Sequence, residues 1–329
     1  MDGLRAISVA LVISGHMSET RIGFIGVRVF FIISGLLITS LLAHEQSRTG
    51  EISLKDFYIR RALRIFPLAY VFIAVVALLW NAGLVSTSGR DLVFASLYTM
   101  CYRLSPSWVL AHLWSLSVEE QFYLLWPLAV VTAGKRAPTV ALLTVLSGPL
   151  LRTLWFVLLP SDRGLLHTAF PNVLDSIALG CLAAFNLEGI AHLAKKIPAA
   201  IVIALPFAAY AMMISPERIA ASGLRRMWVP LADSAINVLL LVFVAGAVYN
   251  AGKLSQFLNW KPMVFVGTIS YSLYIWQQLF VEQANPTVLG TVVRIVVIFA
   301  VAIAAHYAIE KPFLRLKDRF ATKVMAASV

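Results

Sequence analysis

The feature that most constrains this sequence is its series of apolar blocks, each about 20 residues long. A helix of that length crosses the hydrocarbon layer of a bilayer and satisfies its backbone amides within its own segment, as lipid requires. Of the 329 residues, 60% are apolar and only 13% are charged, whereas a soluble domain carries about 25% charged residues. The sequence therefore predicts an all-α fold, a polytopic bundle of transmembrane helices.

We expect ten membrane spans, and an even number places both termini on one side of the membrane. The predicted spans are residues 4–20, 24–44, 64–82, 117–134, 138–159, 169–187, 197–214, 228–249, 263–281 and 288–309. Between the third and the fourth, the stretch 91–104 is apolar but short, with Arg90, Asp91 and Arg103 at its edges. We interpret this stretch as a re-entrant or interfacial helix, because it is too short to cross the bilayer.

The distribution of basic residues indicates the orientation, because cytoplasmic loops are enriched in lysine and arginine. With ten spans, 17 of the 27 lysine and arginine residues fall on the side of the termini, which are therefore predicted to be cytoplasmic. Counting 91–104 as a span would move Lys135 and Arg136 outside, against this rule. The sequence has no internal repeat or low-complexity linker, so we expect one membrane domain over 1–320 and a frayed tail over 321–329.

The composition also argues against other classes of protein. The net charge of +11 suits loops that face an anionic leaflet, and the basic residues form no continuous patch for nucleic acid. Cys101 and Cys181 lie in different kinds of segment, so a disulfide scaffold is not expected. No metal-ligand spacing or phosphate-binding glycine loop occurs. The N-terminus lacks the features of a cleaved signal peptide, so we expect the first apolar stretch to be a retained helix.

The first candidate functional residues are Arg5 and His16 in the first span, because ionisable residues inside spans are costly. Their spacing of eleven residues places both on one face of a helix, about 16 Å apart. The spacing alone fits equally well with an Arg5 side chain that reaches the lipid headgroups and a His16 that caps a helix end.

The second candidate is the run Arg60, Arg61 and Arg64 at the start of the third span. Arg61 and Arg64 are three residues apart, so a helix presents both on one side. Paired guanidinium groups suit phosphates through forked hydrogen bonds. On its own, the run would also serve as an ordinary anchor on the cytoplasmic side.

The third candidate lies where the fourth span begins, in the segment His112–Tyr123. Ser117 is placed to cap a helix N-terminus, with Glu120 at the reciprocal position of a capping box. This capping explains Glu120 and leaves its neighbour Glu119 without a structural role, so we assign the functional role to Glu119. Weaker candidates are explained by packing or interfacial aromatics; they are Ser34 with Gly35, Asp175 with Gly180, and Tyr271–Gln278.

Together these segments resemble the acyltransferase-3 family of bacterial membrane acyltransferases, which includes O-antigen and exopolysaccharide O-acetylases. The resemblance covers nearly the whole chain. It is carried by Arg5-x10-His16, the FFxxSGxL segment at Phe30–Ile38, Arg61 with Arg64, Trp114–Tyr123 and Glu310-Lys-Pro312. Two features depart from the family. Gln277 and Gln278 stand where a histidine is frequent, and no extracytoplasmic hydrolase-like domain is appended, so we expect the membrane domain to act alone or with a partner.

The resemblance implies a membrane O-acyltransferase of the bacterial inner membrane. The acyl group, expected to be acetyl, would pass from a cytosolic acyl-CoA to a hydroxyl of a cell-surface glycan, a glycolipid or a glycosylated small molecule. Acyl-CoA would be a substrate rather than a permanently bound cofactor, and the other partners would be membrane lipids but no nucleic acid.

The resemblance also suggests a role for each candidate residue. Arg61 and Arg64, with Arg60, would hold the CoA phosphates at the cytoplasmic mouth. Arg5, which is counted with His16 and Glu119 among the catalytic residues, would also help to hold the phosphates. His16 would be the general base for the acceptor hydroxyl, because the pKa of imidazole suits that task near neutrality. Glu119 would orient His16 or raise its basicity. Direct transfer within a ternary complex is our preferred mechanism, and a transient acyl-histidine is the alternative.

Two rival functions are considered beside this one. A transporter or flippase would also carry ionisable residues inside its spans, but it is expected to show helix breaks near the midplane in two repeated halves, and this sequence has no such symmetry. The other rival is a non-catalytic scaffold for polysaccharide assembly. Acyl-CoA-dependent esterification by the purified protein would separate the three.

Overall fold

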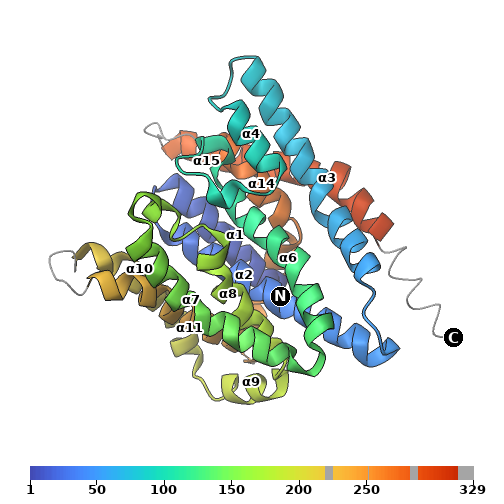
Figure 1. Ribbon diagram of the computed structural model, residues 1–329. Helices are drawn as coiled ribbons and strands as arrows, with labels where there is room; N and C mark the ends of the chain where they lie inside the picture. The colour runs from blue at the N-terminus through green and yellow to red at the C-terminus, as the bar shows by residue number, and fades with distance from the viewer. Residues whose placement is uncertain (219–224, 251, 282–287, 318–329) are drawn as a thin grey trace. The chain divides into compact units, whose positions relative to one another are not determined.

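The computed structural model describes residues 1–218, 225–250, 252–281 and 288–317, and every regular element in these ranges is helical (Figure 1). This confirms the predicted all-α class; the predicted frayed tail 321–329 lies outside the described residues. The α-helices are α1 (Asp2–Met17), α2 (Ile22–Thr49), α3 (Leu54–Asn81), α4 (Gly89–Ser96), α5 (Trp108–Ala111), α6 (Leu113–Ala133), α7 (Ala137–Leu158), α8 (Phe170–Ala184), α9 (Leu187–Ala194), α10 (Ala199–Arg218), α11 (Arg225–Tyr249), α12 (Lys253–Leu258), α13 (Lys261–Thr268), α14 (Ser270–Phe280) and α15 (Val288–Ala305). Short 3-10 or π turns form η1 (Met100–Tyr102), η2 (Gly134–Arg136), η3 (Pro160–Leu165) and η4 (His306–Glu310).

Six helical stretches of the described chain are long and apolar enough to cross a membrane. They are Ile22–Thr49, Leu54–Asn81, Trp108–Leu158, Pro160–Ala184, Pro230–Tyr249 and Gly290–Lys317. A seventh span results if α9 and α10, which are bent by 104° at their break, are counted as one. The chain is therefore built from several potential spans, but the predicted number of ten is not confirmed.

The difference from ten has identifiable causes. Helix α1 has only 16 residues, which is short for a full span. The predicted span 263–281 is divided into α13 and α14, and the predicted spans 117–134 and 138–159 form one 51-residue stretch. The segment 91–104 contains only the short helices α4 and η1, which fits the prediction that it does not cross the bilayer.

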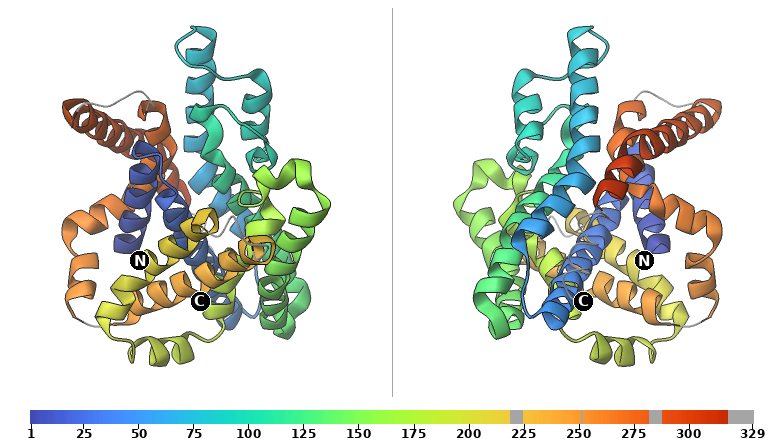
Figure 2. Two further views of the ribbon diagram at one scale, coloured as in Figure 1. Left: turned by 90° about the vertical axis from the view of Figure 1, so that its left-hand side faces the viewer. Right: turned by 90° about the vertical axis from the view of Figure 1, so that its right-hand side faces the viewer.

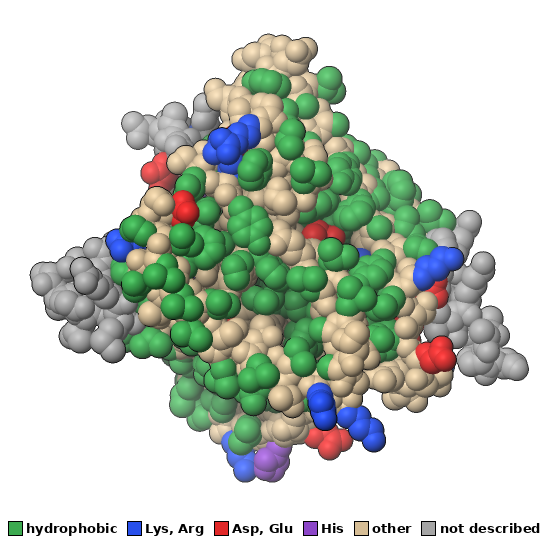
Figure 3. Space-filling view, viewed as in Figure 1, with side chains coloured by type: hydrophobic (Ala, Val, Ile, Leu, Met, Phe, Trp, Pro, Cys, Tyr) green, Lys and Arg blue, Asp and Glu red, His purple; other side chains and the backbone are tan. Residues whose placement is uncertain are grey.

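Large apolar side chains are exposed along the long helices. They include Leu142, Leu143, Leu146 and Leu150 on α7 and Val292, Val293 and Val296 on α15. Hydrophobic side chains are spread over the face drawn in Figure 3, which carries few lysine, arginine, aspartate and glutamate side chains. Contiguous apolar surface is rare on soluble monomers, and helices that expose rows of large apolar side chains are suited to contact lipid.

The chain divides into two compact units, each of which is built from two separate parts of the sequence. The first unit consists of Met1–Leu41 and Ala133–Thr268, and the second of Leu42–Thr132 and Ile269–Val329. In the second unit, α3 and α4 form a helical hairpin that is seen from two further sides in Figure 2, and the Tyr70 hydroxyl of α3 donates to the Ser96 carbonyl of α4.

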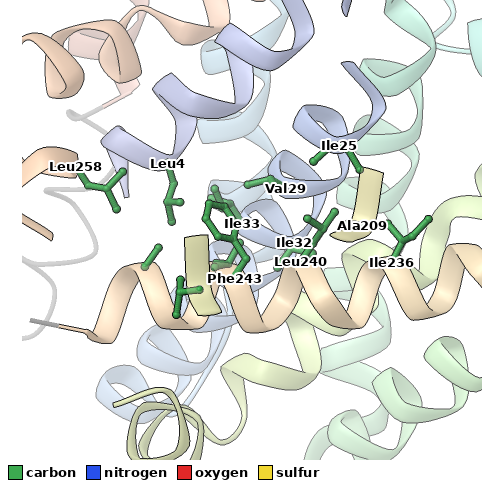
Figure 4. Close-up of a cluster of buried hydrophobic side chains, with 13 residues drawn as sticks. Leu4, Ile25, Val29, Ile32, Ile33, Ala209, Ile236, Leu240, Phe243 and Leu258 are labelled. Carbon is green, nitrogen blue, oxygen red and sulfur yellow. The ribbon is translucent and has the colours of Figure 1, made fainter. Parts of the chain in front are cut away.

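A buried apolar cluster joins α1, α2, α10, α11 and α12 in the first unit (Figure 4). Its members include Leu4, Ile25, Val29, Ile32, Ile33, Ala209, Ile236, Leu240, Phe243 and Leu258. Among helices in lipid, such contacts stabilise the fold through close packing rather than through removal from water.

A pair of glycines brings α2 and α8 of the first unit together. A β-carbon on Gly35 would lie 2.0 Å from the Ile177 carbonyl oxygen, and one on Gly180 would lie 2.1 Å from the Ile32 carbonyl oxygen. Real β-carbons do not approach so closely, so the two backbones can meet only because both positions lack a side chain. The packing role predicted for Gly35 and Gly180 is confirmed.

Arg152 of α7 is fully buried in the first unit, with 0% of its surface exposed. Its guanidinium group donates to both carboxylate oxygens of Asp175, at 2.9 and 2.8 Å, and to the carbonyl oxygens of Pro230 and Asn172 and the hydroxyl of Ser234. These acceptors use all the N–H groups that an arginine has. The arginine therefore ties α7 to both α8 and α11.

A second buried ion pair lies in the same unit. Arg28 of α2 contacts the Asp233 carboxylate of α11 at 2.7 Å and donates to the Asn237 side-chain oxygen at 2.8 Å. The other Asp233 oxygen lies 2.9 Å from Nδ1 of His167. Of these charged residues, Asp175 was the one predicted as a candidate from the sequence, although each of them interrupts or borders an apolar block.

Removal of one partner of the buried Arg152–Asp175 ion pair should destabilise the protein. We expect Asp175→Ala to lower the free energy of unfolding by about 3–5 kcal/mol, because Arg152 would keep an uncompensated buried charge. Unfolding of the detergent-solubilised protein measures the change. Glu188→Ala, at an exposed acid of α9, is the control and should stay within about 0.5 kcal/mol of wild type. Equal stability of the two variants would contradict a structural role for the pair.

The orientation predicted from the basic residues can be tested by cysteine labelling. Single cysteines near Lys135 and Lys195 should react with impermeant reagents only from the cytoplasmic side, and one near Arg163 only from outside. The native Cys101 and Cys181 are buried, so their background labelling should be low. The reverse pattern would show that the orientation is wrong after residue 105.

Candidate functional site

Arg5 and His16 lie on one continuous helix, α1, as the sequence predicted. Arg5 forms a 3.2 Å ion pair with Asp2 at the start of the helix, and His16 lies in its last turn, where its side chain is partly buried. A continuous helix keeps the two residues about 16 Å apart along the axis. Both belong to the first unit.

The arginine run lies in the first turns of α3, in the second unit, and the local sequence fixes this helix start. The Ser53 hydroxyl accepts the Asp56 N–H as an N-cap. Glu45 at the end of α2 accepts the Ser53 N–H at 3.0 Å through one oxygen and pairs with Arg60 at 3.1 Å through the other. Arg60 therefore anchors the start of α3.

Arg61 connects two of the predicted segments within the second unit. Its guanidinium carbon lies 5.0 Å from the centre of the Tyr123 ring of α6 and 5.6 Å from that of Phe57, within the range of cation–π attraction. It also interacts electrostatically with Glu120 and Glu119, which precede Tyr123 by about one helical turn. The structure thus brings the arginine run and the acidic pair close together. In the sequence they are separate motifs, and their proximity was not predicted.

The capping box predicted at Ser117 is wrong. Helix α6 begins at Leu113, so Ser117 lies inside the helix. Its hydroxyl donates to the Leu113 carbonyl at 2.9 Å and accepts the Met100 N–H at 3.1 Å, which fixes η1 against α6. Glu120 consequently has no capping role.

Glu120, rather than the predicted Glu119, has a buried carboxylate oxygen that lacks a partner in the described chain. Its Oε1 atom is buried and has no hydrogen-bond partner among the residues that the structure describes. Glu119 is partly buried on the same helix, and its predicted role stays a prediction. Because Glu120 does not cap the helix, it is as good a candidate for a functional role as Glu119.

Helix α14 and the turn η4 add polar residues to the second unit. The Tyr271 hydroxyl donates to the Ile65 carbonyl of α3 at 2.7 Å. Nδ1 of His306 and the Ser272 hydroxyl both contact Oε2 of Glu310, at 2.9 and 2.8 Å. The π-helical turn that carries His306 and Glu310 is a geometry that occurs often at functional sites. The sequence offered a signal for Glu310 in its Glu-Lys-Pro motif but none for His306.

Gln277 and Gln278, which depart from the family pattern, are both buried in α14. The Gln278 side-chain amide donates to the Trp108 carbonyl of α5, and the Trp108 indole N–H donates to the Val281 carbonyl at 2.7 Å. Gln278 therefore helps to hold α14 against α5.

The predicted site residues are thus divided between the two units. Arg60, Arg61, Arg64 and Glu119 belong to the second unit, whereas Arg5 and His16 belong to the first. The pairing of His16 with Glu119 accordingly stays a prediction.

The chain is similar in sequence to known acyltransferases over most of its length. The chain matches the acyltransferase-3 family, described as an acyltransferase domain, over residues 1–311. It is 31% identical over 313 residues to the O-acetyltransferase OatA of Staphylococcus aureus, an alignment that covers 87% of this chain and 51% of that protein. It is 27% identical over 358 residues to the peptidoglycan O-acetyltransferase OatA of Listeria monocytogenes, covering 95% of this chain and 55% of that protein.

A third relative is the putative peptidoglycan O-acetyltransferase YrhL of Bacillus subtilis. It is 26% identical over 357 residues, an alignment that covers 95% of this chain and 54% of that protein. The chain spans about half the length of the curated relatives that it matches. No solved structure matches it. The family match extends over nearly the whole chain and confirms the resemblance that the motifs carried: the chain belongs to the acyltransferase-3 family.

Proposed function

We propose that this protein is an O-acyltransferase of the bacterial inner membrane that moves an acetyl group from acetyl-CoA to a hydroxyl of a peptidoglycan glycan. The observation that carries the proposal is the family match over residues 1–311. The names of the relatives favour peptidoglycan over the other glycans that the sequence left open. A transporter is not favoured, because these relatives are named as transferases.

The donor would bind at the arginines of α3. The guanidinium carbon of Arg61 lies over the Phe57 and Tyr123 rings, and the N–H groups of a guanidinium lie in its own plane. Arg64 follows three residues later on the same helix. Two such groups suit the CoA phosphates, since each can offer a forked pair of hydrogen bonds.

The transfer would follow the base-assisted route. His16 takes the proton of the acceptor hydroxyl while the hydroxyl oxygen attacks the thioester carbonyl carbon. The carbon–sulfur bond then breaks, and the CoA thiolate leaves and recovers the proton from the imidazolium. The hypothesis drawn from the family resemblance adds that Glu119 would orient the imidazole. In the alternative route, His16 carries the acetyl group transiently as an acyl-imidazole.

The proposal predicts acetyl-CoA-dependent ester formation by the purified full chain in lipid nanodiscs. A β-1,4-linked N-acetylglucosamine oligomer serves as the acceptor, and mass spectrometry detects the acetyl ester. His16→Ala should fold and insert normally but lower the rate by about 100-fold or more, a typical contribution of a general base. His192→Ala, at an exposed histidine of α9, is the matched control and should retain the wild-type rate.

Absence of ester formation by the wild-type protein would contradict the proposed activity. Full activity of a well-folded His16→Ala would instead remove His16 from the mechanism and leave the activity intact.

The donor site predicts a second kinetic result. Lysine keeps the charge of an arginine but loses its forked donor geometry, so Arg61→Lys and Arg64→Lys should each raise the KM for acetyl-CoA, by about tenfold. The value of kcat should fall as well, because remote binding energy positions the thioester. The KM for the oligomer should not change. Arg136→Lys, at an exposed arginine of η2, is the control; a normal donor KM in both test variants would show that these arginines only anchor the helix.

A further inference from the structure

Several buried polar atoms of the second unit have no hydrogen-bond partner among the described residues, and two of them belong to neighbouring segments. These two are Oε1 of Glu120 on α6 and the hydroxyl oxygen of Tyr98, which lies between α4 and η1. Burial of a polar atom without a partner is unfavourable, and such atoms in native proteins call for an explanation. One explanation is that a ligand supplies the missing partners.

The backbone of Tyr98 is held in an unusual conformation. Its φ angle is 53°, in the left-handed region that bulky residues rarely adopt. The Gln121 side-chain amide donates to the Tyr98 carbonyl at 2.9 Å and stabilises the turn. Gln121 directly follows Glu120, so the same part of α6 fixes the turn of Tyr98 and carries the buried carboxyl group. Strained backbone of this kind is concentrated at functional sites.

The ring of Tyr98 is fixed against α3. It stacks on Phe66 with the ring centres 5.4 Å apart and meets the edge of Tyr70 at 6.0 Å. Phe66 follows Arg61 by five residues, which is roughly 8 Å along a helix. The Tyr98 ring therefore lies at a level of α3 that is further from the start of the helix than the arginine proposed for the phosphates.

The two partnerless atoms are complementary in chemistry. Burial, reinforced by the charge of Glu120, raises the pKa of the Tyr98 hydroxyl, so the group stays a hydrogen-bond donor at physiological pH. The Oε1 atom of Glu120 is an acceptor. Tyr98 and Glu120 also interact electrostatically with each other and with Tyr271. This part of α6 and the preceding turn thus present one donor and one acceptor to the same region.

We propose that Tyr98 and Glu120 bind a secondary amide of a substrate. The amide carbonyl would accept from the Tyr98 hydroxyl, and the amide N–H would donate to Oε1 of Glu120. This proposal rests on the proposed function, whose substrates contain such amides in two places: the pantetheine arm of acyl-CoA and the N-acetyl group of the glycan. The position of the Tyr98 ring further along α3 than Arg61 favours the pantetheine arm, which extends from the phosphates towards the thioester.

Equilibrium binding to the full chain in nanodiscs tests the proposal without requiring turnover. Calorimetry measures the Kd of four probes: acetyl-CoA, pantetheine, adenosine 3′,5′-bisphosphate and the N-acetylglucosamine oligomer. Tyr98→Phe removes only the hydroxyl. Because that hydroxyl has no partner to lose within the described part of the chain, the variant should be at least as stable as wild type, yet it should bind acetyl-CoA and pantetheine about tenfold more weakly. Its Kd for the bisphosphate, which has phosphates but no amide, should not change.

Two further variants separate binding from structure. Tyr102→Phe removes a hydroxyl that donates to Oε1 of Gln121 at 3.1 Å, so it should leave all four Kd values unchanged. Glu120→Gln retains a carbonyl oxygen and should bind pantetheine within about threefold of wild type, whereas Glu120→Leu should weaken it about as much as Tyr98→Phe does.

The outcomes identify the amide or reject the site. Weaker binding of pantetheine supports an amide site for the donor, and weaker binding of the oligomer alone supports an amide site for the sugar. Unchanged binding of both in a folded Tyr98→Phe would overturn the proposal, as would wild-type protein that binds neither probe. Failure of the transfer assay with these Kd shifts intact would count against the proposed function only.

Discussion

A bilayer offers no water to a buried charge, and this constraint governs how the chain arranges its few ionisable residues. In the first unit, Arg152 is neutralised by Asp175 and Arg28 by Asp233, at distances below 3 Å. Both pairs join residues of different helices, so the charges also determine which helices pack together. Replacing such a pair by apolar residues can be neutral, whereas breaking it is costly; the helix arrangement therefore depends on the pairs being complete.

The second unit also contains ion pairs, such as Arg60 with Glu45, but two of its charged residues are arranged differently. The guanidinium carbon of Arg61 lies over the Phe57 and Tyr123 rings, while Glu120 keeps a buried oxygen without a partner in the described chain. Charges that are oriented but incompletely paired remain available to a ligand. This contrast is why we place donor binding in the second unit and consider the paired arginines of the first unit to be structural.

The sequence predicted the helical class because the lengths of the apolar blocks reflect a property of the bilayer itself. The close approach at Gly35 was also predictable, since a residue without a side chain among apolar neighbours has few other uses in a span. The number of spans was not, because hydropathy does not reveal the break at Ile269 that divides α13 from α14. Pairings such as Arg28 with Asp233 join residues about 200 positions apart, and one sequence carries no record of them.

The error at Ser117 has a physical cause. Its capping box was a correct local pattern, but tertiary contacts extend α6 back to Leu113, and the Met100 N–H uses the Ser117 hydroxyl instead. Because of that error no functional role was predicted for Glu120, although its buried Oε1 has no hydrogen-bond partner among the residues that the structure describes. Local capping rules describe isolated helices, and they fail where a neighbouring segment supplies the partner.

The proposed function depends on binding of the donor in the second unit, beside Arg61. A CoA analogue with a photoreactive diazirine in place of the acyl group tests it most directly, with cross-linked peptides identified by mass spectrometry. The account predicts labelling of α3, α6 or the turn at Tyr98, and loss of that labelling when excess unlabelled CoA is present. Specific labelling confined to α7, α8 and α11 of the first unit would contradict it.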